Sequence, residues 1–126
     1  MNEGVEKSEL IPEWVSLAGN QSRLSFGLAL TELAERNEKV VAVGADTLDL
    51  VGLRRMQSMY PGRVIDVGIA EQNAIGIASG LATTGMRPYL FGYAPFFTAR
   101  AMEQLRNDVA YANQRVVVGA ACSGVS

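Results

Sequence analysis

The chain has 126 residues, of which 48% are hydrophobic and 19% are charged, a composition expected of one globular domain with a buried core. Its net charge of -2 gives no basic surplus that would favour nucleic acid or an anionic membrane surface. Histidine is absent, so this chain alone cannot build a Ser-His-Asp site, a Cys-His site or a His-ligated zinc site.

The single cysteine, Cys122, excludes an internal disulfide and is expected to be a small buried hydrophobic residue. This use of cysteine fits a reducing compartment, and the N-terminus shows no signal-peptide pattern. No apolar run approaches the roughly 18 residues that a membrane helix needs. We therefore expect a cytoplasmic protein.

The first predicted unit is a polar arm, residues 1–20, which Trp14 could anchor to the body of the domain. A helix is predicted next, because Phe26, Leu30 and Leu33 recur at spacings of four and three. These three side chains are expected to form the buried face of that helix.

Short apolar runs at 40–43 and 64–68 predict two buried strands, with a short helix between them. The second strand leads directly into a helix that begins at Glu71 and is rich in small residues. A glycine inside a helix costs about 1 kcal/mol relative to alanine. Gly76 and Gly80 therefore predict that this helix approaches a neighbour closely.

A third strand is predicted at 87–91, a helix from about 96 to 112, and a last strand at 116–118. The alternation of helices and strands predicts an α/β fold, a parallel sheet with helices on both faces. Ligands in such folds bind beyond the carboxyl ends of the strands. Three segments follow strand ends and are candidates for chemistry: 44–47, 68–72 and 92–97.

Glu71 stands just past the second strand, where a helix begins. By position alone it is a helix N-terminal carboxylate, which the helix dipole favours by about 0.3–1 kcal/mol. Its neighbours are mostly apolar or small, and a carboxylate among them is costly unless it is given a donor. A ligand nitrogen is a candidate for that donor.

Tyr93 and Phe96 flank a proline after the third strand and could form a flat wall for a heteroaromatic ring, while Phe97 is expected in the core. Asp46 is typical of a turn or helix cap. Arg23 is typical of a solvated arginine, although a guanidinium also matches phosphate geometry.

The sequence shows neither a phosphate-cradling glycine loop nor a metal-binding Asp/Asn pair, so it is predicted to hold a ring but not a diphosphate with its metal.

The segment DVGIAEQN at 66–73, followed by GIASGLA at 76–82, resembles the pyrimidine-binding domain of transketolase-like thiamine diphosphate enzymes. Gly-Ala-Asp at 44–46, Tyr-Ala-Pro-Phe-Phe at 93–97 and the polar stretch 100–108 support this resemblance. The Glu-Gln-Asn motif within the first segment is its most specific part.

In that family, the glutamate at the position of Glu71 bonds the ring nitrogen of the aminopyrimidine. It thereby stabilises the imino tautomer, which removes the proton from the thiazolium carbon. The resemblance further implies that Tyr93 and Phe96 pack on the aminopyrimidine. It also implies that Asp46 lies near the cofactor and that Arg23 contacts sugar phosphate.

The resemblance implies a pyrimidine-binding domain at 21–126 that is incomplete at its C-terminus, because family members continue into further strands, a histidine-bearing segment and a third domain. The magnesium site belongs to a separate diphosphate-binding domain. Four parallel strands alone would leave an edge and an apolar face uncovered. We therefore expect a truncated piece of a split enzyme, or a fragment of its C-terminal subunit. It is expected to be inactive alone and to work in a homo- or hetero-oligomer with a diphosphate-binding N-terminal transketolase subunit.

The resemblance favours a transketolase, which moves a two-carbon ketol unit between sugar phosphates. Within the same chemistry, the alternative is a 1-deoxyxylulose-5-phosphate synthase-like enzyme. The pyruvate-dehydrogenase type fits the Glu-Gln-Asn and Arg-Asn-Asp context less well. An alternative of another class is a non-catalytic interaction subunit that retains the fold.

Overall fold

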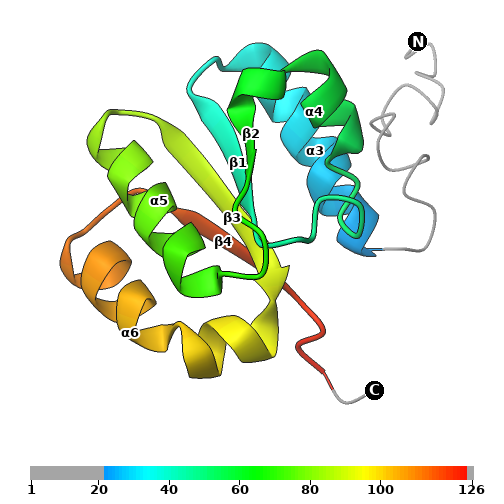
Figure 1. Cartoon of the computed structure of the whole chain (residues 1–126). Helices are drawn as coiled ribbons and strands as arrows, with labels where there is room; N and C mark the ends of the chain where they lie inside the picture. The colour runs from blue at the N-terminus through cyan, green and yellow to red at the C-terminus, as the bar shows by residue number, and fades with distance from the viewer. Residues whose placement is uncertain (1–21, 125–126) are drawn as a thin grey trace, which may run out of the picture.

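A single sheet of four parallel strands organises the domain, as the sequence predicts (Figure 1). The computed structural model describes residues 22–124, so the predicted arm at 1–20 lies outside the described residues. The strands lie side by side in the order β2-β1-β3-β4. In chain order they are β1 (Val40–Gly44), β2 (Val64–Asp66), β3 (Arg87–Tyr93) and β4 (Val117–Ala121).

Helices cover both faces of this sheet (Figure 1). Helices α3 (Ser22–Arg36) and α4 (Arg54–Met59) lie on one face, and α5 (Glu71–Thr83) lies on the other with the helical segment at 96–111. The α/β architecture predicted from the sequence is therefore confirmed. The helical segments are α3 (Ser22–Arg36), α4 (Arg54–Met59), η1 (Pro61–Arg63), α5 (Glu71–Thr83), η2 (Phe96–Arg100), α6 (Met102–Gln104) and η3 (Leu105–Tyr111).

Strand β1 lies in the middle of the core, and all five of its residues are buried. Successive side chains of a strand point to opposite faces of the sheet. Val40 and Ala42 accordingly pack beneath α3 and α4, whereas Val41 and Val43 pack beneath α5. A strand buried on both faces needs a continuous apolar run, which explains why β1 does not alternate between polar and apolar residues.

The helix predicted from about 96 to 112 is wrong as a continuous α-helix, because η2 and η3 are π-helical turns on either side of α6. In these turns a backbone N–H bonds the carbonyl five residues earlier, as in the 3.0 Å bond from Ala101 N to Phe96 O. The apolar side chains of this segment recur every four residues, a longer spacing than the 3.6-residue turn of an α-helix. The wider π turns keep them over the sheet.

Three other expectations are corrected by the side-chain environments. Leu33 is exposed, and Ala34, one position later on α3, is buried in its place. Gly76 and Gly80 face open space, since a Cβ added at either would meet nothing within 4 Å. Cys122 is exposed just after the edge strand β4.

Among the described residues, no helix is long and apolar enough to span a bilayer.

Candidate functional site

Glu71 is the first residue of α5, and it is buried with 3% of its surface exposed. The loop that leads to it is fixed by Asp66, whose Oδ1 accepts hydrogen bonds of 2.9 Å from the backbone nitrogens of Gly68 and Asp46. Gly68 has a φ of 72°, which glycine adopts without the strain that other residues would have. The carboxyl ends of β1 and β2 are therefore tied together directly before Glu71.

Arg100 supplies the hydrogen-bond partner of the buried carboxylate. Its Nη2 donates to Oε2 of Glu71 at 2.6 Å, and its side chain remains 48% exposed. The sequence suggested a ligand nitrogen as the donor, whereas the structure uses a guanidinium from η2. An ion pair of this kind offsets part of the cost of burying a charge beneath apolar residues.

The aromatic wall predicted from the sequence lies beside this ion pair. Tyr93 ends β3, and its ring meets that of Phe96 edge-on, with centroids 5.8 Å apart and planes at 78°. The guanidinium of Arg100 lies over the ring of Phe96, 4.6 Å from its centroid. Phe96 is 39% exposed and Phe97 is 1% exposed, so the predicted core role of Phe97 is confirmed.

A hollow of about 350 Å³ opens at this point, lined by residues 69–73 and Arg100. It lies beyond the carboxyl ends of the parallel strands, where ligands bind in such sheets. Its surface combines backbone at a helix start, one buried carboxylate and one guanidinium. Phe96 is linked to this hollow through its contact with Arg100.

Of the five predicted site residues, only Glu71 lines the hollow. Asp46 is exposed, has a φ of 56° and reaches the site only through the bond from its backbone nitrogen to Asp66. Arg23 is exposed on the first turn of α3. Glu71 is connected to Phe96 through Arg100, and Phe96 contacts Tyr93.

Arg100 is a candidate functional residue to which the sequence patterns assigned no role. The sequence did indicate that Arg100 lies beside Phe96. Arg100 follows Phe96 by four positions, and residues four apart lie on one side of a helical segment. Its pairing with Glu71 depends instead on the packing of η2 against α5. Within residues 22–124, no group of three acidic, histidine or cysteine side chains is placed to hold a metal ion.

Comparison with known proteins extends these observations. The family model for the transketolase pyrimidine-binding domain matches residues 19–125. A 1-deoxy-D-xylulose-5-phosphate synthase of Desulfotalea psychrophila is 42% identical over 100 residues, which are 79% of this chain and 15% of that protein. One subunit of the apulose-4-phosphate transketolase of Phocaeicola vulgatus is 38% identical over 104 residues, 82% of this chain and 33% of that subunit.

A solved structure also matches, that of a split-gene transketolase described as an inactive beta4 tetramer. It superposes with a TM-score of 0.66 at 36% sequence identity, covering 75% of this chain and 32% of the other. The chain therefore spans about a third or less of the length of these relatives. Because the family model covers nearly all of the sequence and a split transketolase shares the fold, the chain belongs to the transketolase pyrimidine-binding-domain family.

Proposed function

We propose that this chain forms the pyrimidine-binding part of a thiamine diphosphate site in a transketolase. The enzyme would transfer a two-carbon ketol unit between sugar phosphates. The observation that carries the proposal is the buried carboxylate of Glu71 at the carboxyl ends of the strands, beside the rings of Tyr93 and Phe96. Family membership supports the same chemistry.

The residues present fit the aminopyrimidine ring. The carboxylate of Glu71, whose Oε2 is paired with Arg100, would accept a hydrogen bond from a protonated ring nitrogen, and Phe96 offers a partly exposed aromatic ring. When bound, thiamine diphosphate supplies the reactive thiazolium carbon. In this proposal, Glu71 holds a proton at the ring nitrogen, while the apolar surroundings of Glu71 keep water away from it.

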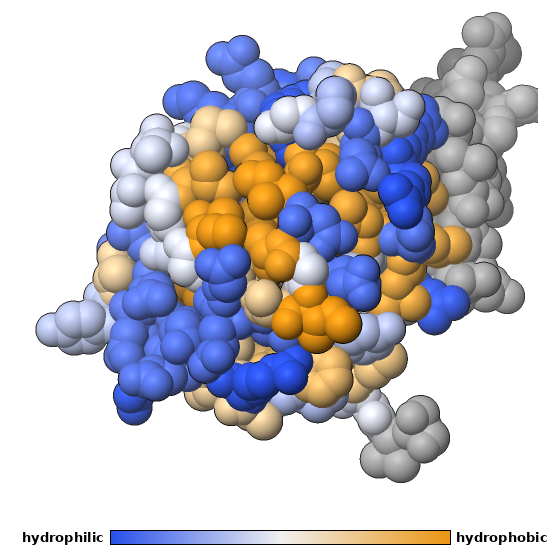
Figure 2. Space-filling view, in the orientation of Figure 1, coloured by the Kyte–Doolittle hydropathy of each residue, from blue (hydrophilic) through white to orange (hydrophobic). Residues whose placement is uncertain are grey.

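The diphosphate, its magnesium ion and the sugar phosphate require a partner subunit in this proposal. Figure 2 shows that hydrophobic side chains gather in the centre of one face of the molecule, over the edge strand β2 and the neighbouring part of α5. Ile69, which lines the hollow, is 75% exposed. Exposed apolar surface beside a half-built site is typical of a protein interface. We assign this face to the diphosphate-binding partner.

A second function, 1-deoxyxylulose-5-phosphate synthesis, is favoured by one observation. Synthases of this kind are up to 45% identical to the chain, whereas two transketolase subunits are 36% and 38% identical. The two activities use different substrates. Assays of the assembled enzyme with a ketose phosphate donor, and separately with pyruvate and a triose phosphate, therefore separate them.

The test of the site uses the chain, or a longer parent protein, assembled with its partner subunit, magnesium and thiamine diphosphate. Glu71→Gln should abolish most of the turnover and leave the assembly intact, because the amide cannot stabilise the protonated ring nitrogen as a carboxylate does. Glu35→Gln is the matched control, since Glu35 is exposed on α3 and lies outside the hollow. Full activity of Glu71→Gln would refute the proposal.

A further inference from the structure

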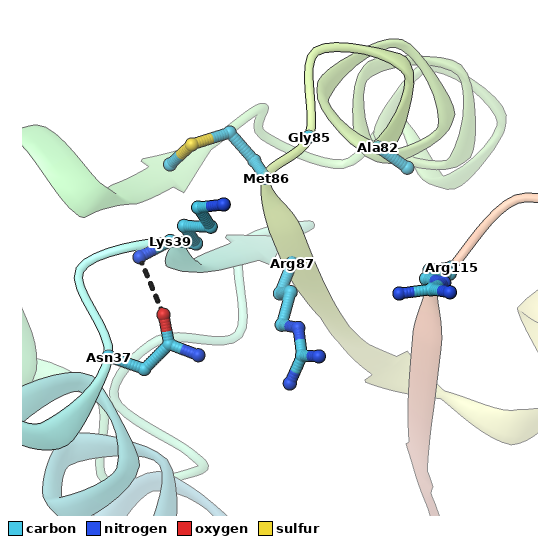
Figure 3. A pocket seen from close by; sticks show the side chains of 7 residues that line it. All are labelled: Asn37, Lys39, Ala82, Gly85, Met86, Arg87 and Arg115. Carbon is cyan, nitrogen blue, oxygen red and sulfur yellow. Dashed lines mark hydrogen bonds between the residues drawn. The ribbon is translucent and has the colours of Figure 1, made fainter.

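The end of the sheet opposite Glu71 carries a second hollow, of about 550 Å³, and all the charged residues that line it are basic. Lys39 comes directly before β1, Arg87 is the first residue of β3, and Arg115 lies two residues before β4 (Figure 3). This hollow therefore lies at the amino ends of the parallel strands, whereas the candidate cofactor site lies at their carboxyl ends.

The sheet fixes Arg87 and Arg115 as neighbours, whereas the side chain of Lys39 points toward Met86 and away from that of Arg87 (Figure 3). The backbone nitrogen of Arg87 donates a 2.7 Å hydrogen bond to the carbonyl of Lys39. Tyr89 pairs with Val117 in the β3–β4 register, so Arg87 and Arg115, each two positions earlier, lie side by side. Backbone pairing thus sets where the chain runs at Arg87 and Arg115, next to each other at this end of the sheet.

In the described part of the chain, the side chains of Lys39, Arg87 and Arg115 make no ion pair and no hydrogen bond. Other arginines have carboxylate partners, as Arg54 has Asp49 and Arg100 has Glu71. The like charges of Arg87 and Arg115 repel one another, and this repulsion is relieved when an anion binds between them. The chain as a whole carries a net charge of -2, so this concentration of positive charge is local.

A smaller hollow of about 190 Å³ adjoins the first and shares Arg87 and Arg115 with it. Its other lining residues are apolar or aromatic: Pro88, Tyr89, Val116 and Val117. Guanidinium groups bind phosphate through paired hydrogen bonds, and small-molecule sites combine a few polar groups with apolar walls. We propose that this end of the sheet binds a small phosphorylated molecule, with its phosphate between Arg87 and Arg115 and its organic part in the adjoining hollow.

The first test titrates inorganic pyrophosphate into the isotope-labelled 126-residue chain and follows the amide signals by NMR, with calorimetry for affinity. The largest shifts are expected around Arg87 and Arg115. Largest shifts around Arg100 would overturn the proposal, because they would place the anion at the candidate cofactor site. Failure of pyrophosphate to bind would overturn it as well.

The second test removes charge. Arg87→Gln combined with Arg115→Gln should weaken pyrophosphate binding at least about tenfold, since two charge-assisted hydrogen bonds are lost. Arg106→Gln, at an exposed arginine outside the hollow, should change it less than about twofold. Equal losses in both proteins would refute a specific site. If the double variant does not fold, Arg115→Gln alone should still weaken binding, and unchanged affinity there would refute the proposal.

The third test concerns the organic part of the ligand. Phenyl phosphate should bind more tightly than inorganic phosphate, because its ring can enter the hollow beside Tyr89. Equal affinities would exclude that hollow from the site. A longer parent protein should keep the site; if it binds pyrophosphate much more weakly than the 126-residue chain, its additional polypeptide covers the cations and the proposal of a metabolite site fails.

Discussion

Arg100 donates a 2.6 Å hydrogen bond to Glu71 although the two residues are 29 positions apart. The carboxylate is 3% exposed, while the side chain of its partner is 48% exposed. A buried charge is thus neutralised by a group that solvent can reach. Under the proposed function, the ring nitrogen of the cofactor and the guanidinium of Arg100 interact with the same carboxylate.

Arg100→Gln should lower the free energy of unfolding by about 1–2 kcal/mol, because it leaves the carboxylate of Glu71 buried with a weaker donor. The loss should be much smaller when Glu71→Gln is present as well, since two neutral amides remove the uncompensated charge. Denaturant unfolding of the two single variants and the double variant measures this coupling. Strictly additive effects would show that the pair contributes nothing to stability.

Phe96 and Phe97 are adjacent in sequence but should respond differently to replacement by alanine. Phe96→Ala should weaken thiamine diphosphate binding in the assembled enzyme about tenfold and change stability little, because the ring is 39% exposed. Phe97→Ala should cost about 3–5 kcal/mol of stability, because that ring is 1% exposed. Calorimetry and thermal unfolding measure the two effects. Unchanged cofactor affinity in Phe96→Ala would remove that ring from the site.

Those features that depend on local pattern could be predicted from the sequence. The apolar run of β1 and the start of a helix at Glu71 follow from periodicity and from position after a strand. The pairing of Arg100 with Glu71 could not be predicted, because it depends on how η2 packs against α5 in three dimensions. The exposure of Gly80 was missed for the same reason, since the composition of a helix does not show which face meets a neighbour.

Gly92 should tolerate no side chain, because an added Cβ would lie 2.9 Å from Cζ of the buried ring of Phe97. Gly92→Ala should therefore destabilise the domain by about 1–3 kcal/mol as the ring is displaced. Gly80→Ala is the matched control, since its Cβ would meet nothing within 4 Å and alanine is favoured in a helix by up to about 1 kcal/mol. Denaturant unfolding of both variants measures the contrast, and a stable Gly92→Ala protein would show that Phe97 can shift at little cost.

Asp66 should be the residue that holds the loop before Glu71 in place. One of its oxygens accepts the backbone N–H groups of both Asp46 and Gly68, so its loss frees two strand ends together. Asp66→Ala should lower stability by about 1–2 kcal/mol and speed amide exchange at Asp46 and Gly68, because both donors then bond only to water. Asp66→Asn should retain most of the protection, since the amide still offers one acceptor oxygen.

The effect of Asp66 on function should appear only through Glu71. In the assembled enzyme, Asp66→Ala should weaken thiamine diphosphate binding, because the loop that positions the carboxylate is no longer fixed. Combining it with Glu71→Gln should add little further loss, since the group that the loop positions is already gone. Calorimetric titration of the unmodified protein, the two single variants and the double variant tests this coupling. Independent, additive losses would mean that Asp66 stabilises the fold without positioning Glu71.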